Sequence, residues 1–228
     1  MSLLTVAQNV ADEIGLKQPG AIAGVDTATA RRFLAMANRA GDSLGKEKWG
    51  ILTTDHSFSM VSGTQAYTAP ADFDSMISDT QWDQTENRQI FGGMSAEQWE
   101  SQKGSAIVPI IHKRFRVRGT VIEFVDTVDT TDTIAYEYRS RNWAQDAAGD
   151  SKAKFTLDTD SARMDETILE LGLMWRMKRA LGLDFISDRG EYEIAKNRAL
   201  AQDHGLPTIN QAGGERVLTN LPEGNFNV

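Results

Sequence analysis

The chain has 228 residues, of which 40% are hydrophobic and 25% are charged, a balance that favours a folded globular protein over a disordered one. Its formal net charge is −8, whereas a general nucleic-acid binder usually carries an excess of positive charge. No run of 18 apolar residues is present, so no membrane span is predicted. Cysteine is absent, which excludes disulfides, thiolate metal sites and a cysteine nucleophile, and fits synthesis in a reducing cytosol.

Acidic residues concentrate in the middle of the chain. Residues 49–111 hold 2 basic and 8 acidic residues, a net charge of −6, whereas residues 112–163 hold 9 of each. A surface with this excess of carboxylates repels the phosphates of a nucleic acid. Residues 49–111 are therefore a poor candidate for a DNA-binding surface.

Two amphipathic helices are predicted at the N-terminal end. Apolar residues repeat at helical spacing from Leu3 to Leu16, and Pro19 follows in a glycine-containing turn. The second helix runs to Lys48, and Asp26 or Thr27 is placed to accept its first free backbone N–H groups. Together they form a helical hairpin.

Strand and turn signals take over from residue 49 to residue 143. The best hairpin is Lys113–Val125, where a two-residue turn at Arg118 and Gly119 would place Arg114 opposite Glu123 and Phe115 opposite Ile122. A further strand, Thr133–Arg139, directs alternate apolar side chains to one face.

Between these strands, Ser95–Lys103 is predicted to be a short helix, because Ser95 and Gln98 fit a capping box. Trp49 closes the second helix and Trp143 closes the β region. Both are expected to pack where the helices meet the β region.

The C-terminal part returns to helical periodicity. Ala162–Leu181 is apolar around most of its circumference, and such a helix is normally buried by several neighbours or by partner subunits. A fourth helix begins near Asp188 and ends at Asp203, before Gly205. The residues after it show no period and form a tail.

The predicted fold is mainly α with a β insertion (α+β). A four-helix core is interrupted by a small antiparallel β-rich region and followed by an extended C-terminal tail. The segments are residues 1–48 as the N-terminal helical hairpin, 49–160 as the β-rich insertion, 161–205 as the C-terminal helices of the core, and 206–228 as the tail.

No motif supports catalysis, and we assign no catalytic, cofactor-binding or metal-binding residue. Asp126, Asp129 and Asp132 offer oxygens that a hard cation would accept, but a solvated turn between two strands is the better interpretation. Asp158 and Asp160 precede a helix, where carboxylates cap free N–H groups.

Arg114, Arg116 and Arg118 form the one local basic stripe, because alternate residues of a strand share a face. Cross-strand pairing with Glu123 is the first interpretation. A contact with a subunit or another partner is the second, and DNA phosphate is the third.

Several strings, taken in order, resemble a known family. They are Tyr67–Phe73, which reads Tyr-x-x-Pro-x-Asp-Phe, the late helical string Trp175–Leu183, and Tyr192–Ala195. With the two N-terminal helices and the strand-turn-strand passage before Tyr67, the chain resembles the head-to-tail adaptor (connector) family of tailed bacteriophages. That family includes the tail tubular protein A, or tail accessory factor, of short-tailed phages.

The resemblance implies a structural virion protein at the head–tail junction and no enzyme or cofactor. Members form a homo-oligomeric ring, usually of twelve copies, beneath the portal protein. The ring extends the channel through which double-stranded DNA passes without specific binding. It also docks the next tail component, a nozzle or tail tube.

Three sets of residues are assigned from this interpretation. The tail is expected to bind the portal through sparse apolar residues: Leu206, Ile209, Val217, Leu218, Leu221 and Phe226. Asp74, Asp79 and Asp83 are expected to face the channel and repel DNA, unless they only solvate an outer surface. The arginine stripe is the candidate subunit or partner contact.

Two other functions stay open on sequence grounds. The first is a muralytic cell-wall hydrolase that acts during entry with two unassigned carboxylates. The second is a DNA-binding packaging or clamp protein, against which the charge balance argues.

Overall fold

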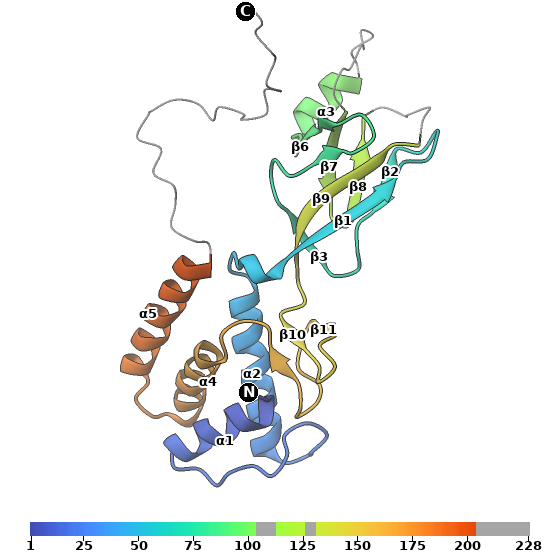
Figure 1. Cartoon of the computed structure of the whole chain (residues 1–228). Helices are drawn as coiled ribbons and strands as arrows, with labels where there is room; N and C mark the ends of the chain where they lie inside the picture. Colours follow the sequence, from blue (N-terminus) through green and yellow to red (C-terminus); the bar gives the residue numbers. More distant parts are fainter. Residues whose placement is uncertain (104–112, 126–130, 204–228) are drawn as a thin grey trace, which may run out of the picture.

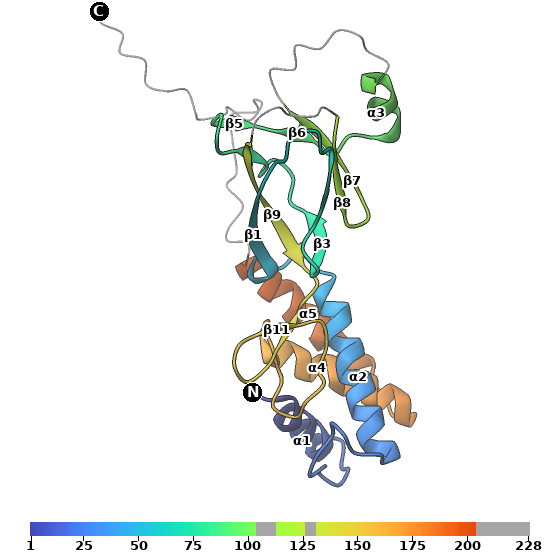
Figure 2. The same ribbon diagram turned by 90° about the vertical axis from the view of Figure 1, so that its right-hand side faces the viewer.

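The computed structural model describes residues 1–103, 113–125 and 131–203. These residues form an elongated molecule with a helical half and a β half (Figures 1 and 2). The five α-helices are α1 (Leu3–Glu13), α2 (Ala28–Gly45), α3 (Ala96–Lys103), α4 (Glu166–Leu181) and α5 (Ile186–Asp203). All but α3 lie in the helical half.

Local capping signals set the beginning of the helices. The Thr27 hydroxyl accepts the N–H of Ala30 at 3.2 Å and begins α2, as predicted. The capping box before α3 is also confirmed, since the Ser95 N–H donates to Gln98 Oε1 at 3.0 Å and the Gln98 N–H to Ser95 Oγ at 3.2 Å.

The capping role predicted for Asp158 and Asp160 is wrong. Asp165 begins α4, and its carboxylate accepts the N–H of Thr167. Asp158 Oδ1 instead accepts the N–H groups of Ile22 and the next residue, at 3.0 and 2.8 Å. The short strand Ser161–Ala162 and the residues that flank it separate these two carboxylates from the start of α4.

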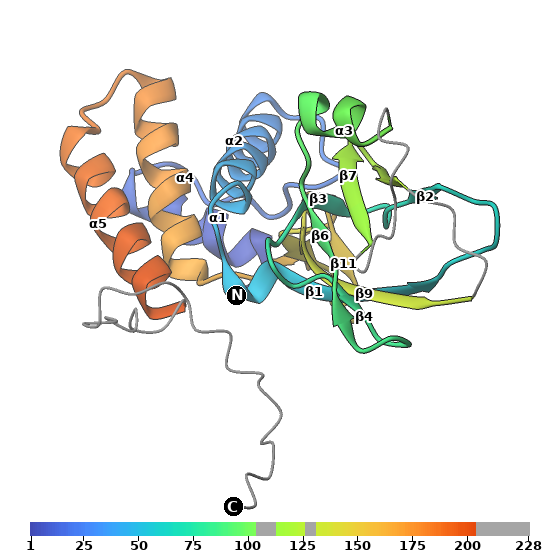
Figure 3. The ribbon, with the colours of Figure 1, turned by 90° about the horizontal axis from the view of Figure 1, so that it is seen from above.

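The apolar helix α4 is buried by neighbours within the chain. It contacts α1, α2 and α5, and Figure 3 shows it between the last two. Its buried residues include Ile168, Leu169, Leu173 and Met177. The helix ends at Gly182, whose φ of 76° lies in the left-handed region that favours glycine.

Within the part of the chain that the structure describes, twelve strands form three sheets. The first has the order β1-β9-β4-β5, with β3 also paired to β9; the second has the order β2-β8-β7-β6; the third has the order β11-β10-β12. The strands are β1 (Thr53–Ser59), β2 (Ala66–Thr68), β3 (Phe73–Met76), β4 (Trp82–Asp83), β5 (Arg88–Gln89), β6 (Phe91–Gly92), β7 (Arg114–Arg118), β8 (Val121–Phe124), β9 (Thr133–Ser140), β10 (Ala144–Gln145), β11 (Ser151–Lys152) and β12 (Ser161–Ala162).

The predicted architecture, mainly α with a four-helix core and a small β-rich insertion, is therefore wrong. The described residues hold five α-helices and twelve strands in three sheets. Seven of these strands, β4 to β6 and β10 to β12 among them, are no more than three residues long. A strand of two or three residues is too short to show alternating apolar and polar side chains. Its formation depends instead on partner strands that are distant in sequence.

The register of the central hairpin also differs from the prediction. Arg116, and not Arg114, lies opposite Glu123. The two-residue turn consists of Gly119 and Thr120, one residue later than predicted. Gly119 has a φ of 59°, and glycine accepts that conformation without steric cost.

Two hydrophobic cores lie along the molecule, one among the helices and one inside the β half. Trp49 and Trp143 both pack in the helical core. Their expected position where the helices meet the β region stays a prediction. The indole N–H of Trp49 donates to the carbonyl of Leu44 at 2.8 Å, and that of Trp143 donates to Asp42 at 3.0 Å. The ring of Trp143 lies directly on Gly41 of α2.

Residues 141–165 connect the two halves. Phe155, inside this segment, is buried in the helical core, and its ring meets that of Trp143 edge to face at 4.7 Å. The division of the chain at residues 49–160 stays a prediction.

Candidate functional site

The string that carries the family resemblance forms a corner between β2 and β3. The Tyr67 hydroxyl lies within hydrogen-bond distance of the backbone of Val61 and of Thr64, at 2.9 to 3.3 Å. Phe73 stacks on Tyr138 of β9 at a ring distance of 5.7 Å. Pro70, between them, offers its carbonyl to the N–H of Phe73 at 3.0 Å. The string therefore ties the corner to the turn before β2 and to β9.

Asp72 is the polar centre of this corner. Its carboxylate accepts hydrogen bonds from the hydroxyls of Tyr138 at 2.8 Å and Ser140 at 2.6 Å. Burial alone would raise the pKa of Asp72, but the hydrogen bonds from Ser140 and Tyr138, a backbone hydrogen bond and the positive charge of Arg141 together outweigh burial and hold the pKa below its ordinary value. Burial and the bond to Asp72 raise the pKa of Tyr138 to about 12. The corner is locked by an ionised carboxylate at neutral pH.

The arginine stripe lies on the face of β7 that α3 covers. Arg116 Nε donates to Glu123 at 2.6 Å, and its guanidinium lies 4.1 Å from the centre of the Trp99 ring. Arg118 is more exposed and reaches Glu123 at 3.6 Å. Arg114 lines a groove between α3 and β6. Pairing with Glu123 thus holds for two of the three arginines, and the partner contact stays a prediction.

The structure separates the three predicted channel residues. Asp74 and Asp79 are exposed. Asp83 is buried, with 2% of its surface exposed, and it forms an ion pair with Lys113. Asp83 therefore cannot present its charge to a channel, because β4 turns it into the β half. The channel-facing role of Asp74 and Asp79 stays a prediction.

Lys113 also binds Asp132, with Nζ 2.7 Å from Oδ2. Burial alone would lower the pKa of Lys113, but its hydrogen bonds to Asp132 and Asp83 outweigh burial and raise it. Asp132 is 3% exposed, so its interpretation as part of a solvated turn is wrong. Asp126 and Asp129 lie outside the described residues.

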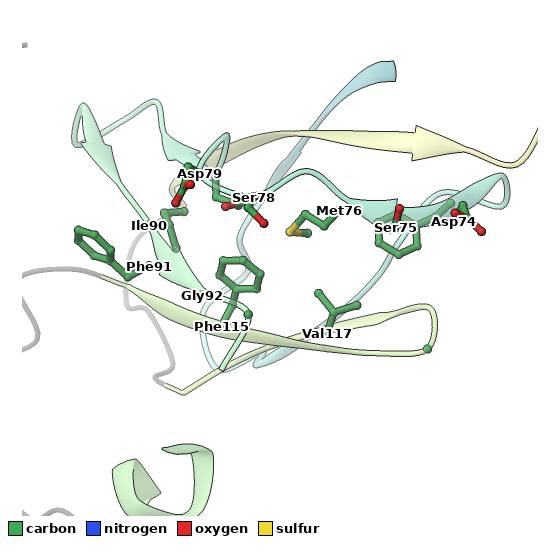
Figure 4. A pocket seen from close by; sticks show the side chains of 14 residues that line it. Asp74, Ser75, Met76, Ser78, Asp79, Ile90, Phe91, Gly92, Phe115 and Val117 are labelled. Atoms are coloured by element: carbon green, nitrogen blue, oxygen red, sulfur yellow. The ribbon is translucent and has the colours of Figure 1, made fainter. Parts of the chain in front are cut away.

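A groove opens between β3 and β7, where the first and second sheets of the β half meet (Figure 4). Its volume is about 460 Å³, within the range of ligand pockets in proteins. Met76, Phe115 and Val117 point into it, and Asp74 and Asp79 lie along its β3 side. Periodicity along the chain does not predict this groove, because its walls come from separate sheets. The adjacent glycines at 92 and 93 are the one local hint of a close backbone approach.

The remaining features are the tail, metal-binding groups and membrane-spanning helices. The candidate portal-binding residues of the tail all lie outside the described residues. Within residues 1–103, 113–125 and 131–203, no group of three or more His, Cys, Asp or Glu side chains is arranged to hold a metal ion. No helix in the same ranges is both long enough and apolar enough to cross a bilayer.

A model of the SU10 adaptor protein family matches residues 1–219, which is nearly the whole chain. No curated protein matches the sequence significantly.

Proposed function

Because the chain belongs to the SU10 adaptor protein family, a family of phage adaptors, we propose that it forms a ring beneath the portal protein. As a phage adaptor it is a virion component that associates with other head and tail parts. In our proposal twelve copies extend the DNA channel and dock the next tail component, as in the tail tubular protein A group. The observation that carries the proposal is the family match over residues 1–219.

The surface of α5 supports assembly with a neighbouring copy. Ile186 is 76% exposed and Ile194 is 71% exposed, and both lie on this outermost helix (Figure 3). Burial of these two side chains against another protein would be favourable, because it removes apolar surface from water. Since α4 is already covered within the chain, α5 is the better candidate for a contact between subunits.

Sedimentation of the purified chain, alone and with its portal, tests the ring. We expect the chain alone to sediment as a monomer or weak oligomer, and to co-migrate with the portal as a ring when the two are mixed. Negative-stain images of the complex would count the copies in the ring. A stable ring without portal, or separate migration of the two proteins, would contradict the proposal. Lysis of cell walls by the purified protein would instead support the muralytic alternative.

The tail is the proposed portal attachment. Its apolar residues sit among Gly, Asn and Pro, a pattern suited to extended docking. Deleting residues 206–228 should leave the thermal melt nearly unchanged, because both hydrophobic cores lie within the described residues before them. Portal binding should disappear. A truncated protein that still co-sediments with portal would refute this role.

A further inference from the structure

We propose that the groove between β3 and β7 binds an extended basic segment of the next tail component, which adds a strand between the two sheets. The mode of binding is inferred from two strand edges, the groove lining and its charge. The identity of the partner rests on the proposed function.

The first edge belongs to β7. Val117 lies opposite Ile122, which also pairs with Tyr67 of β2. The hairpin closes between Arg118 and Val121, so Val117 occupies a non-hydrogen-bonded position and its backbone N–H and C=O point away from β8. On that side β6 pairs only with the beginning of β7. The edge at Val117 thus offers one donor and one acceptor to the groove.

The second edge belongs to β3. The N–H of Ile77 donates to the carbonyl of Glu137 at 3.0 Å, which makes the neighbouring pair of Met76 and Tyr138 a non-hydrogen-bonded one. The backbone N–H and C=O of Met76 therefore point away from β9. Among the described strands, β3 pairs with β9 alone. Two strand edges whose outward backbone groups have no strand partner among the described residues thus border the same groove.

The lining selects the side chains of the occupant. Met76, Phe115 and Val117 point into the groove from its two walls, and Ile90 lies at one end (Figure 4). A strand between β3 and β7 would place alternate side chains over these apolar groups and the others in solvent. The inward positions therefore require apolar residues such as valine.

The charge of the lining selects the outward residues. Asp74 and Asp79 are the two charged residues among those that line the groove, and both are acidic. Lysine or arginine at outward positions would meet these carboxylates. The tail of this chain suits the groove poorly, since residues 204–228 hold Glu215 and Glu223 against Arg216, a net charge of −1. A basic segment of another protein fits better.

Hydrogen exchange on the full chain tests the proposal, with a capped hexapeptide of alternating valine and lysine as the probe. At a peptide concentration ten times Kd, about one chain in eleven is free, so exchange at the amides of Met76 and Val117 should slow about tenfold. A peptide with glutamate in place of lysine should give no protection. Absence of protection by the lysine peptide at 1 mM would mean that Kd exceeds about 1 mM, a binding free energy weaker than about −4 kcal/mol, and overturns the proposal.

Two variants probe the backbone edge. Val117→Pro removes the donor that faces the groove without removing a bond between β7 and β8, so binding should be lost while the melt is retained. Thr68→Pro is the matched control, because Thr68 is exposed at the opposite edge of the same sheet, and it should bind as the wild type does. A folded Val117→Pro variant with unchanged affinity overturns the proposal.

Charge gives an independent measurement that does not depend on a proline. Asp74→Asn with Asp79→Asn should weaken binding several-fold, and the effect should shrink as salt rises. Unchanged affinity would refute the charge argument. Tighter binding of a peptide with the sequence of residues 214–222 would assign the groove to the tail of a neighbouring copy instead. Portal co-sedimentation is a separate readout, so failure of the groove leaves the ring proposal standing.

Discussion

The contact between Trp143 and Gly41 joins the segment after β9 to the middle of α2, and Gly41→Ala perturbs it directly. A Cβ atom at position 41 would fall among the atoms of the Trp143 six-membered ring, well under 3.0 Å from three of them. The ring cannot move aside easily. It is 2% exposed, packs against Phe155, and is tied to Asp42 by its N–H.

Two opposing effects set the magnitude. Alanine favours the helix over glycine by about 0.5–1 kcal/mol, whereas overpacking of a filled core costs about 1–3 kcal/mol. We expect overpacking to win, with a net loss of about 1–2 kcal/mol in the free energy of unfolding. For a chain of this size that corresponds to a fall of roughly 2–8 °C in Tm.

Thermal and urea denaturation measure this loss, and the chain offers a matched control. Gly190 lies in α5, with nothing within 4 Å of a Cβ placed there, so Gly190→Ala should stabilise by about 0.5–1 kcal/mol. The penalty at Gly41 should also shrink in a Trp143→Phe background, where the ring is smaller. A Gly41→Ala protein as stable as Gly190→Ala would refute the reasoning.

Three further predictions follow from the β half. Asp72→Asn should lower the free energy of unfolding by about 1–2 kcal/mol at neutral pH, since it removes a charged hydrogen-bond acceptor. The pKa of Asp72 in the folded state lies below the ordinary 3.8. The stability difference between wild type and variant is therefore fully present above pH 3.8 and should fade as the pH drops through the folded-state pKa. Lys113→Met should lower the free energy of unfolding by about 3 kcal/mol, measured by urea denaturation, because it leaves two buried carboxylates facing each other. Lys103→Met is the control: it removes an exposed ion pair and should lower the free energy of unfolding by less than about 0.5 kcal/mol. Asp74→Lys with Asp79→Lys should slow DNA ejection in a salt-dependent way if these residues face the channel, and should block attachment of the next tail component if they line a docking groove.

Each of these has an outcome that would contradict it. For Asp72→Asn, a stability difference from wild type that stays constant down to pH 3 would mean that the carboxylate is not held ionised by its hydrogen bonds. Equal costs at positions 113 and 103 would mean that burial does not strengthen the ion pair. Complete particles that eject DNA normally despite both charge reversals would exclude both roles for the acidic pair.

The helices and the longest strand follow from the sequence, because their signals are local. The hydroxyl of Thr27 and the capping box of Ser95 and Gln98 each act within three residues, so their effect is visible in the chain itself. The apolar circumference of α4 correctly indicated burial on several sides. Alternation in β9 likewise predicted a half-buried strand, and its inward residues are Ile134, Tyr136 and Tyr138.

The β half depended on contacts that the sequence does not encode locally. The turn lies one residue later than predicted, and this places Arg116 instead of Arg114 opposite Glu123. Turn geometry sets the register of a hairpin, and the residues that flank this turn are compatible with both registers. Only the fold buried Asp83 beside Lys113 and turned an expected surface charge into an internal ion pair. The groove between β3 and β7 exists because two sheets leave their edges unpaired side by side, which is a property of tertiary structure alone.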